Sequence, residues 1–164
     1  MAGGKGTWWW IGSMETRGGR SRMKPEVALA VLEREGCWLL QLRDDDVRIV
    51  YPGQWGLFGG HLEPGELADE AVKRELDEEI GWWPKEPLQH WFSHESDRRI
   101  AHIYRGKLNV PIDELSLKEG QELQLVTLEE INNGKIWSHE RQEMRPVVDG
   151  LMIVYERWMQ THNG

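Results

Sequence analysis

Residues 60–82 read GHLEPGELADEAVKRELDEEIGW, and three glutamates fall within five positions near the end of this stretch. The stretch predicts a helix from about Leu67 to Ile80, because Pro64 and Gly65 precede it and Gly81 follows it. The last turns of this short helix therefore carry three negative charges that repel one another.

The three glutamates, Glu75, Glu78 and Glu79, share one side of the predicted helix with its apolar residues. At about 100° per residue, Glu79 lies about 40° and Glu78 about 60° from Glu75. The apolar residues on this arc are Leu67, Ala68, Ala71 and Val72. Like charges at such spacing repel by about 3 kcal/mol at an effective dielectric of 20. A divalent cation that prefers oxygen ligands, Mg²⁺ or Mn²⁺, would relieve the repulsion. The alternative is a solvated acidic helix end.

The same stretch resembles the signature of the Nudix hydrolase family. That signature is Gly, five residues, Glu, seven residues, Arg-Glu and a bulky apolar residue, one residue, Glu-Glu, one residue, then Gly and a bulky apolar residue. The matching positions are Gly60, Glu66, Arg74, Glu75, Leu76, Glu78, Glu79, Gly81 and Trp82. Trp82 is aromatic where aliphatic residues are more usual, which we expect to affect packing only. The resemblance covers about Met23 to Gln160 and implies an α/β/α sandwich with a mixed β-sheet between helices.

The resemblance also implies a site and a reaction. Its expected metal ligands are Glu75, Glu78, Glu79 and the carbonyl of Gly60. Its expected catalytic residues are Glu66, Arg74, Glu75, Glu78 and Glu79, with Glu66 bracing the loop and Arg74 holding the glutamates by charge-assisted hydrogen bonds. Water would attack a phosphorus of a diphosphate linkage with Mg²⁺ as cofactor, for which Mn²⁺ could substitute. Glu75 and a glutamate in a later loop are alternative general bases.

Five residues outside the signature are further candidates. Glu119 lies in a KEGQ segment similar to a loop of MutT-type members whose glutamate reaches the metal, and the alternative is a surface turn. Arg43 and Arg98 resemble MutT-type positions that contact phosphate or base, although either also fits a solvated loop. Trp55 and His61 flank Gly59-Gly60, where a tryptophan could stack on a nucleobase or belong to the core.

The sequence indicates the substrate less clearly than it indicates the type of reaction. Phe58 stands where MutT-type members usually have proline, and residues 136–146 show no counterpart of the asparagine that reads an oxidised guanine. The favoured substrate is a (deoxy)nucleoside triphosphate, cleaved to monophosphate and pyrophosphate, ahead of ADP-ribose or a nucleotide sugar. The alternatives from other classes are a non-catalytic nucleotide-binding module and a calcium-binding protein. Asp44, Asp45 and Asp46 suggest the latter, but the EF-hand spacing is absent.

The remaining apolar patterns complete a mixed order of strands and helices. The predicted strands are 27–32, 38–43, 89–92, 101–108 and 122–126, with a short apolar piece at 55–58. Thr127 and Glu130 form a capping-box pattern for a short helix, and apolar residues recur at helical spacing from Pro146 to Gln160.

Length and charge set the class of protein. The 164 residues suit one domain, and we expect residues 1–22 to be a disordered extension preceding a domain at 23–164. That domain has 16 basic and 27 acidic residues, a formal charge of −11, which disfavours binding to duplex nucleic acid. No apolar run reaches the roughly 20 residues that span a bilayer. A single cysteine, Cys37, is typical of the cytoplasm. We therefore expect a small nucleotide as partner, with monomer or homodimer left open.

Overall fold

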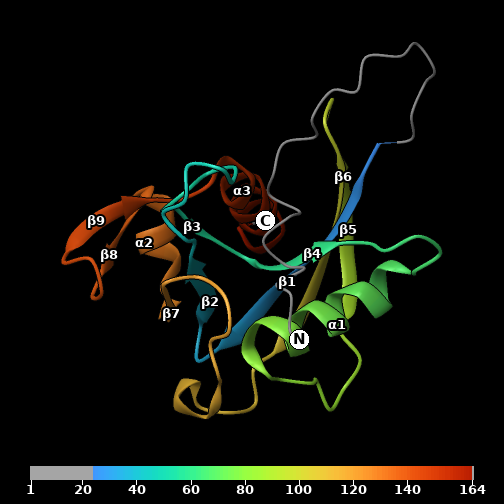
Figure 1. Ribbon diagram of the computed structural model, residues 1–164, viewed down its shortest axis with the longest axis horizontal. Helices are drawn as coiled ribbons and strands as arrows, with labels where there is room; N and C mark the ends of the chain where they lie inside the picture. Colours follow the sequence, from blue (N-terminus) through green and yellow to red (C-terminus); the bar gives the residue numbers. More distant parts are fainter. Residues whose placement is uncertain (1–23, 164) are drawn as a thin grey trace.

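The computed structural model describes residues 24–163, which form a mixed β-sheet with a helix on each face (Figure 1). The elements are β1 (Glu26–Arg34), β2 (Cys37–Leu42), β3 (Trp55–Gly56), β4 (Phe58–His61), α1 (Ala68–Ile80), β5 (Gln89–Glu95), β6 (Ile100–Lys107), a 3₁₀ turn (Ile112–Glu114), β7 (Glu122–Val126), α2 (Leu128–Asn132), β8 (Lys135–Ser138), β9 (Glu143–Pro146) and α3 (Asp149–His162). The predicted extension at 1–22 lies outside the described residues. Among those described, no helix combines the length and apolarity needed to cross a bilayer.

Strand β1 organises the main sheet. The strand order is β3-β2-β1-β6-β5, with β4 also paired to β1 and β7 to β2. The pairing of β1 with β6 is parallel, and the other pairings in this sheet are antiparallel. Six successive residues of β1 are buried, as expected for a strand covered on both faces.

The two faces of β1 contribute to two separate cores, because successive side chains of a strand point to opposite sides. Ala28, Ala30 and Leu32 belong to a core beneath α1. Val27, Leu29 and Val31 belong to the core beneath α3. The predicted sandwich of helices around a mixed sheet is confirmed.

Trp55 belongs to the core on the α3 side. Its side chain is fully buried, and its indole Nε1 donates to the carbonyl of Ile136 at 3.2 Å. A large aromatic ring whose N–H has a hydrogen-bond partner is stable in a core, so Trp55 stabilises the protein by being buried. The prediction that Trp55 stacks on a nucleobase is therefore wrong, because no face of the ring is exposed.

The signature helix is α1, and it begins and ends within one residue of the predicted bounds. Gly81 ends it in the left-handed conformation, with φ of 62° and its N–H bonded to the carbonyl of Asp77 at 3.0 Å. The helix packs against β1 and β4, which places its inward side chains beneath Gly59 and Gly60.

The β8–β9 hairpin was not predicted from the sequence. The buried carboxylate of Glu122, on β7, holds its turn. That carboxylate accepts the Ser138 hydroxyl at 2.6 Å and the backbone N–H groups of His139 at 3.0 Å and Glu140 at 3.3 Å. Because this anchor is a long-range contact to a polar residue, hydrophobic periodicity gave no sign of it.

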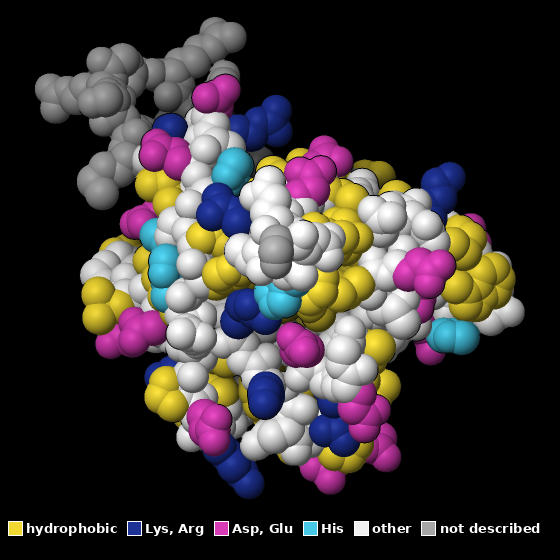
Figure 2. All heavy atoms as spheres, turned by 180° about the vertical axis from the view of Figure 1, so that it is seen from behind, with side chains coloured by type: hydrophobic (Ala, Val, Ile, Leu, Met, Phe, Trp, Pro, Cys, Tyr) yellow, Lys and Arg dark blue, Asp and Glu magenta, His cyan; other side chains and the backbone are white. Residues whose placement is uncertain are grey.

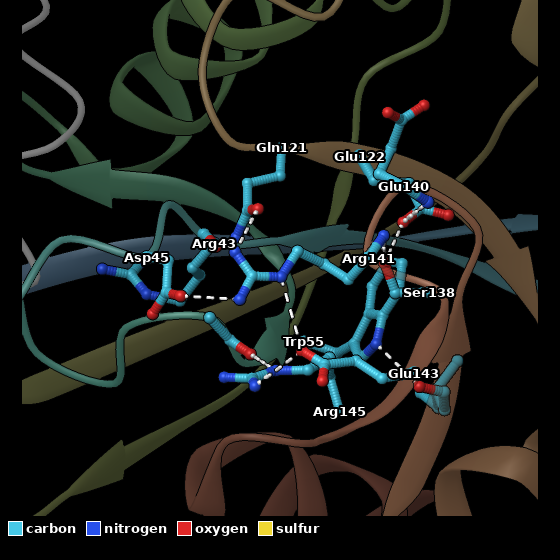
Figure 3. Close-up of polar contacts among 12 residues, drawn as sticks. Arg43, Asp45, Trp55, Gln121, Glu122, Ser138, Glu140, Arg141, Glu143 and Arg145 are labelled. Carbon is cyan, nitrogen blue, oxygen red and sulfur yellow. Dashed lines mark hydrogen bonds and ion pairs between the residues drawn. The ribbon is translucent and has the colours of Figure 1, made fainter.

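Two arginines attach the hairpin to the loop between β2 and β3 (Figure 3). Arg141 forms an ion pair with Asp45 at 2.9 Å. Arg145 donates from Nε to the carbonyl of Gly53 at 2.8 Å and from Nη1 to Glu143 at 3.1 Å. The loop that follows β2 is thereby fixed at both of its ends.

We expect Glu122→Gln to destabilise the fold by about 1–3 kcal/mol, because an amide N–H would then face groups that are themselves donors. Chemical denaturation measures this free energy of unfolding. Glu140→Gln is the matched control, since its exposed carboxylate takes part in none of these bonds. Equal stability of the two variants would contradict the anchoring role of Glu122.

Candidate metal centre

Arg74 lies at the centre of an ion cluster at the end of α1. Its Nε and Nη2 donate to the two carboxylate oxygens of Glu66 at 2.8 and 2.9 Å. Its Nη1 donates to Glu75 at 2.8 Å and to Glu78 at 3.3 Å, and Nη2 also reaches the carbonyl of His61 at 3.0 Å. These hydrogen bonds lower the pKa of Glu66 and raise that of Arg74, so both groups are charged at neutral pH.

Glu75 and Glu79 point into the protein, as the helical arc predicted. Their exposed fractions are 2% and 1%. The prediction that Glu78 is turned inward with them is not confirmed, because its side chain is 37% exposed at the rim. Burial raises the pKa of Glu75 to about 7 in spite of Arg74. Burial, reinforced by the charge of Glu75, raises the pKa of Glu79 well above its ordinary value. Two carboxylates are thus held where ionisation is costly.

The surroundings of Glu75 fit a divalent cation. Its Oε2 is buried and has no hydrogen-bond partner, which is unusual for a carboxylate oxygen. A Cβ at position 60 would lie 2.5 Å from the Glu75 Cδ, so only glycine lets the backbone approach this closely. Glu79 lies beside it, with Oε2 accepting the N–H of Gly59 at 3.0 Å. An unpaired oxygen, a second buried carboxylate and an adjacent backbone are the hard donors that Mg²⁺ prefers.

The carboxylates do not converge as they lie. Within residues 24–163, no three His, Cys, Asp or Glu side chains come close enough together to hold a metal ion. Glu75 and Glu78 both contact Nη1 of Arg74 instead.

Glu119 is carried to the same region by a loop bonded to its surroundings. Lys118 donates its backbone N–H to the carbonyl of Glu79 at 2.8 Å, and Gln121 donates to that of Leu42 at 2.8 Å. The negative charge of Glu119 contributes to the raised pKa of both Glu75 and Glu79. The loop therefore lies beside the acidic centre, and the metal-binding role of Glu119 remains a prediction.

Arg43, at the end of β2, is a cation buried next to the acidic centre. Only 3% of it is exposed, and its Nε donates to the carbonyl of Val50 at 3.1 Å. Burial lowers the pKa of Arg43 to about 9, against the opposing charge of Glu79, so the guanidinium stays charged at neutral pH. Arg43 was predicted to contact phosphate or base, and a position next to the acidic centre is compatible with that role.

A second cation near Arg43 is Arg99. Its positive charge contributes to the lowered pKa of Arg43 and, after burial, to that of His61. Burial also lowers the pKa of Arg99 itself. Arg43, Arg99 and His61 thus form a basic group. On the face drawn in Figure 2, side chains of Lys or Arg, of His and of Asp or Glu lie close together near the middle.

Arg98, which was predicted to contact phosphate or base, does not belong to this basic group. Its neighbour Arg99 does. Arg98 is exposed in the turn before β6, where its backbone N–H bonds the hydroxyl of Ser96 at 3.3 Å. Neighbouring residues at the start of a strand point to opposite sides, so only one of the pair could turn inward. Sequence alone offered no means of choosing between two adjacent arginines.

The fold and this acidic centre agree with the comparisons with known proteins. The profile of the NUDIX domain matches residues 23–147, which include the whole signature. The chain belongs to the NUDIX domain family. The resemblance read from nine residues of one stretch is confirmed.

Individual relatives cover different shares of this Nudix chain. Nucleoside triphosphatase NudI of Salmonella arizonae is 46% identical over 55 residues, which are 34% of this chain and 38% of that protein. The match therefore spans well under half the length of that relative. The MutT protein of Methanosarcina mazei is 25% identical, with a TM-score of 0.65 over 88% of this chain and 100% of that one. The ORF135 protein of E. coli is 28% identical, with a TM-score of 0.60 over 84% and 91%.

We expect the metal-free protein to lose stability as the pH rises from about 5 to 7. The pKa of Glu75 in the folded chain is about 7, above its ordinary value of 4.5, so between these values the folded state binds more protons than the unfolded state. The free energy of unfolding then falls with pH, by on the order of 3 kcal/mol across the window.

Melting temperatures measured from pH 5 to 8 in EDTA test this expectation. Glu75→Gln should make the curve less steep, with the raised pKa of Glu79 causing the slope that is left. Asp77→Asn, an exposed change on the same helix, should keep the parent curve. Added Mg²⁺ should restore stability at pH 8, because it binds the folded state alone. Identical dependence of melting temperature on pH in the parent and in Glu75→Gln would contradict the raised pKa of Glu75.

Proposed function

We propose that this chain is a Mg²⁺-dependent pyrophosphohydrolase that cleaves the diphosphate linkage of a nucleoside diphosphate derivative. The substrate we favour is a (deoxy)nucleoside triphosphate, converted to monophosphate and pyrophosphate. The observation that carries this proposal is the buried, unpaired Oε2 of Glu75, next to Gly60 and Glu79. Ionisation of a buried carboxylate whose oxygen has no donor is costly, and a bound cation offsets this cost.

The proposed metal-binding residues are Glu75, Glu78, Glu79, Glu119 and the carbonyl of Gly60. The bound ions would lower the pKa of the attacking water and neutralise charge on the transferring and leaving oxygens. Arg74 positions Glu75 and Glu78, and Glu66 in turn holds Arg74 with both oxygens. Of the two candidate general bases, Glu75 lies in the centre and Glu119 approaches it from the loop.

The basic group supplies what the acidic centre lacks, a place for the anionic part of the substrate. A domain with a charge of −11 repels a polyphosphate, so local cations must overcome this repulsion. Arg43 lies next to Glu79, and Arg99 lies near Arg43 and His61. The two arginines are suited to bind phosphate oxygens, which arginine contacts with two parallel hydrogen bonds. The likeness to a nucleoside triphosphatase over 55 residues also favours a triphosphate.

Hydrolysis of a panel of nucleotides with Mg²⁺ tests the proposal. We expect monophosphate and pyrophosphate from a nucleoside triphosphate in the parent chain. Glu78→Gln should reduce the rate at least a hundredfold, because it removes a ligand charge and keeps the shape of the side chain. Asp77→Asn, which removes an exposed charge from the neighbouring position, should keep the parent rate.

The products discriminate between substrates. Two monophosphates from ADP-ribose or a nucleotide sugar, with triphosphates left intact, would move the substrate to that class. Nucleotide binding without turnover would favour a non-catalytic module. Parent-like turnover by a folded Glu78→Gln would reject the proposed role of this glutamate.

Arg99 and Arg98 form a matched pair for testing substrate binding. We expect Arg99→Gln to raise the KM for the triphosphate about ten- to a hundredfold, because a charged hydrogen bond to phosphate contributes about 1.5–3 kcal/mol. Arg98→Gln should change KM less than twofold, since this side chain is in the exposed turn. The reverse order of effects would show that Arg98 is the substrate contact.

A further inference from the structure

A second polar cluster lies on β1, β6 and β5, three strands that run side by side (Figure 1). Glu26 Oε1 lies 2.8 Å from His102 Nε2, and His102 Nδ1 lies 2.7 Å from Ser93 Oγ. His90 Nε2 lies 2.9 Å from the same hydroxyl. The cluster shares no residue with the ion cluster around Arg74, and the proposed pyrophosphohydrolase does not use it.

The direction of each hydrogen bond follows from the chemistry of the groups. An ionised carboxylate only accepts, so the proton of neutral His102 resides on Nε2 and is donated to Glu26. The Nδ1 of His102 then carries a lone pair and accepts the hydroxyl proton of Ser93. His90 donates to the Ser93 oxygen, which leaves a continuous relay from His90 through Ser93 and His102 to Glu26.

We propose that Ser93 is an activated nucleophile at a second site, one that hydrolyses small neutral carboxylic esters. Three conditions for such a site are met: a hydroxyl within hydrogen-bond reach of a base, a base oriented by a carboxylate, and an accessible oxygen. Ser93 and His90 are exposed, whereas the side chain of His102 is 19% exposed and therefore restrained. The register pairs Ser93 directly with His102 across β5 and β6, so regular sheet geometry maintains the contact.

The reaction balances without any further reagent. Ser93 Oγ forms a bond to the ester carbonyl carbon as its proton passes to His102 Nδ1. The bond from that carbon to the alcohol oxygen then breaks, and His102 returns the proton to the leaving alcohol. Water, deprotonated by His102, next attacks the acyl-serine and releases the carboxylic acid, and Ser93 recovers its proton.

The surrounding charges select for a neutral ester. Glu26 belongs to the relay, and Glu95, in the same strand as Ser93, forms an ion pair with Lys24 at 2.7 Å. Tyr104, whose ring contacts His90 edge-on, has its pKa raised by burial and by the charge of Asp69. Glu26 and Asp69 therefore place negative charge near the relay, while the charge of Glu95 is balanced by Lys24, and this arrangement disfavours an anionic acyl donor.

The test uses the full chain in EDTA, which silences metal-dependent hydrolysis, with a fluorophosphonate and 4-nitrophenyl acetate as probes. We expect a single covalent fluorophosphonate adduct, located on Ser93 by mass spectrometry of peptides. Ser93→Ala should abolish the adduct, and His102→Asn should slow its formation at least a hundredfold. Glu26→Gln should slow it at least tenfold, because a neutral amide no longer stabilises the imidazolium.

Ser96→Ala is the matched control, since Ser96 is an exposed serine of the following turn whose hydroxyl accepts backbone N–H groups. It should label at the parent rate. Ser93→Ala should also keep the parent melting temperature and Mg²⁺-dependent nucleotide hydrolysis, which separates the second site from the first. Absence of an adduct on Ser93, or labelling unchanged in both His102→Asn and Glu26→Gln, would overturn the proposal.

Discussion

The contact between Arg74 and Glu66 supports the whole acidic centre. Arg74 donates hydrogen bonds to both carboxylate oxygens of Glu66. From that position it also donates to Glu75, to Glu78 and to the carbonyl of His61. One cation therefore joins the helix, the preceding loop and the end of β4. Without it, adjacent carboxylates would repel each other at the end of a helix whose own dipole is negative there.

The carboxylates of Glu75 and Glu79 stay buried because the surrounding structure holds their part of α1 against the core. Glu75 and Glu79 continue the apolar face of α1, so turning them outward would expose the core beside them. Gly60 allows the backbone of β4 to pass directly over the carboxylate of Glu75, and Gly59 allows it to lie close to the backbone of β1 at Ala28 and Leu29, at distances that a Cβ would prevent. The strain is local, and the same geometry is what makes the site suitable for a cation.

The groups around the acidic centre come from distant parts of the chain. The loop bearing Glu119 is bonded to the end of α1, and Arg43 is fixed at the end of β2. The β8–β9 hairpin restrains the loop after Arg43 through Asp45 and Gly53. A basic group thus forms beside an acidic one, in a domain whose net charge alone would repel a nucleotide. This pairing of charges is the physical basis of the proposed substrate class.

The sequence by itself determined the features that depend on local spacing. The helix bounds follow from the Pro and Gly residues at its ends, and the inward direction of Glu75 and Glu79 follows from the 3.6-residue repeat of a helix. The family was indicated by the resemblance of residues 60–82 to the Nudix signature. Tertiary structure alone showed that Arg99 lies near Arg43 while Arg98 is exposed, and it placed Trp55 in the core. It also formed the hairpin on Glu122 and aligned Ser93 with His102 and Glu26. Each of these depends on contacts between residues far apart in the chain, and local periodicity carries no information about such contacts.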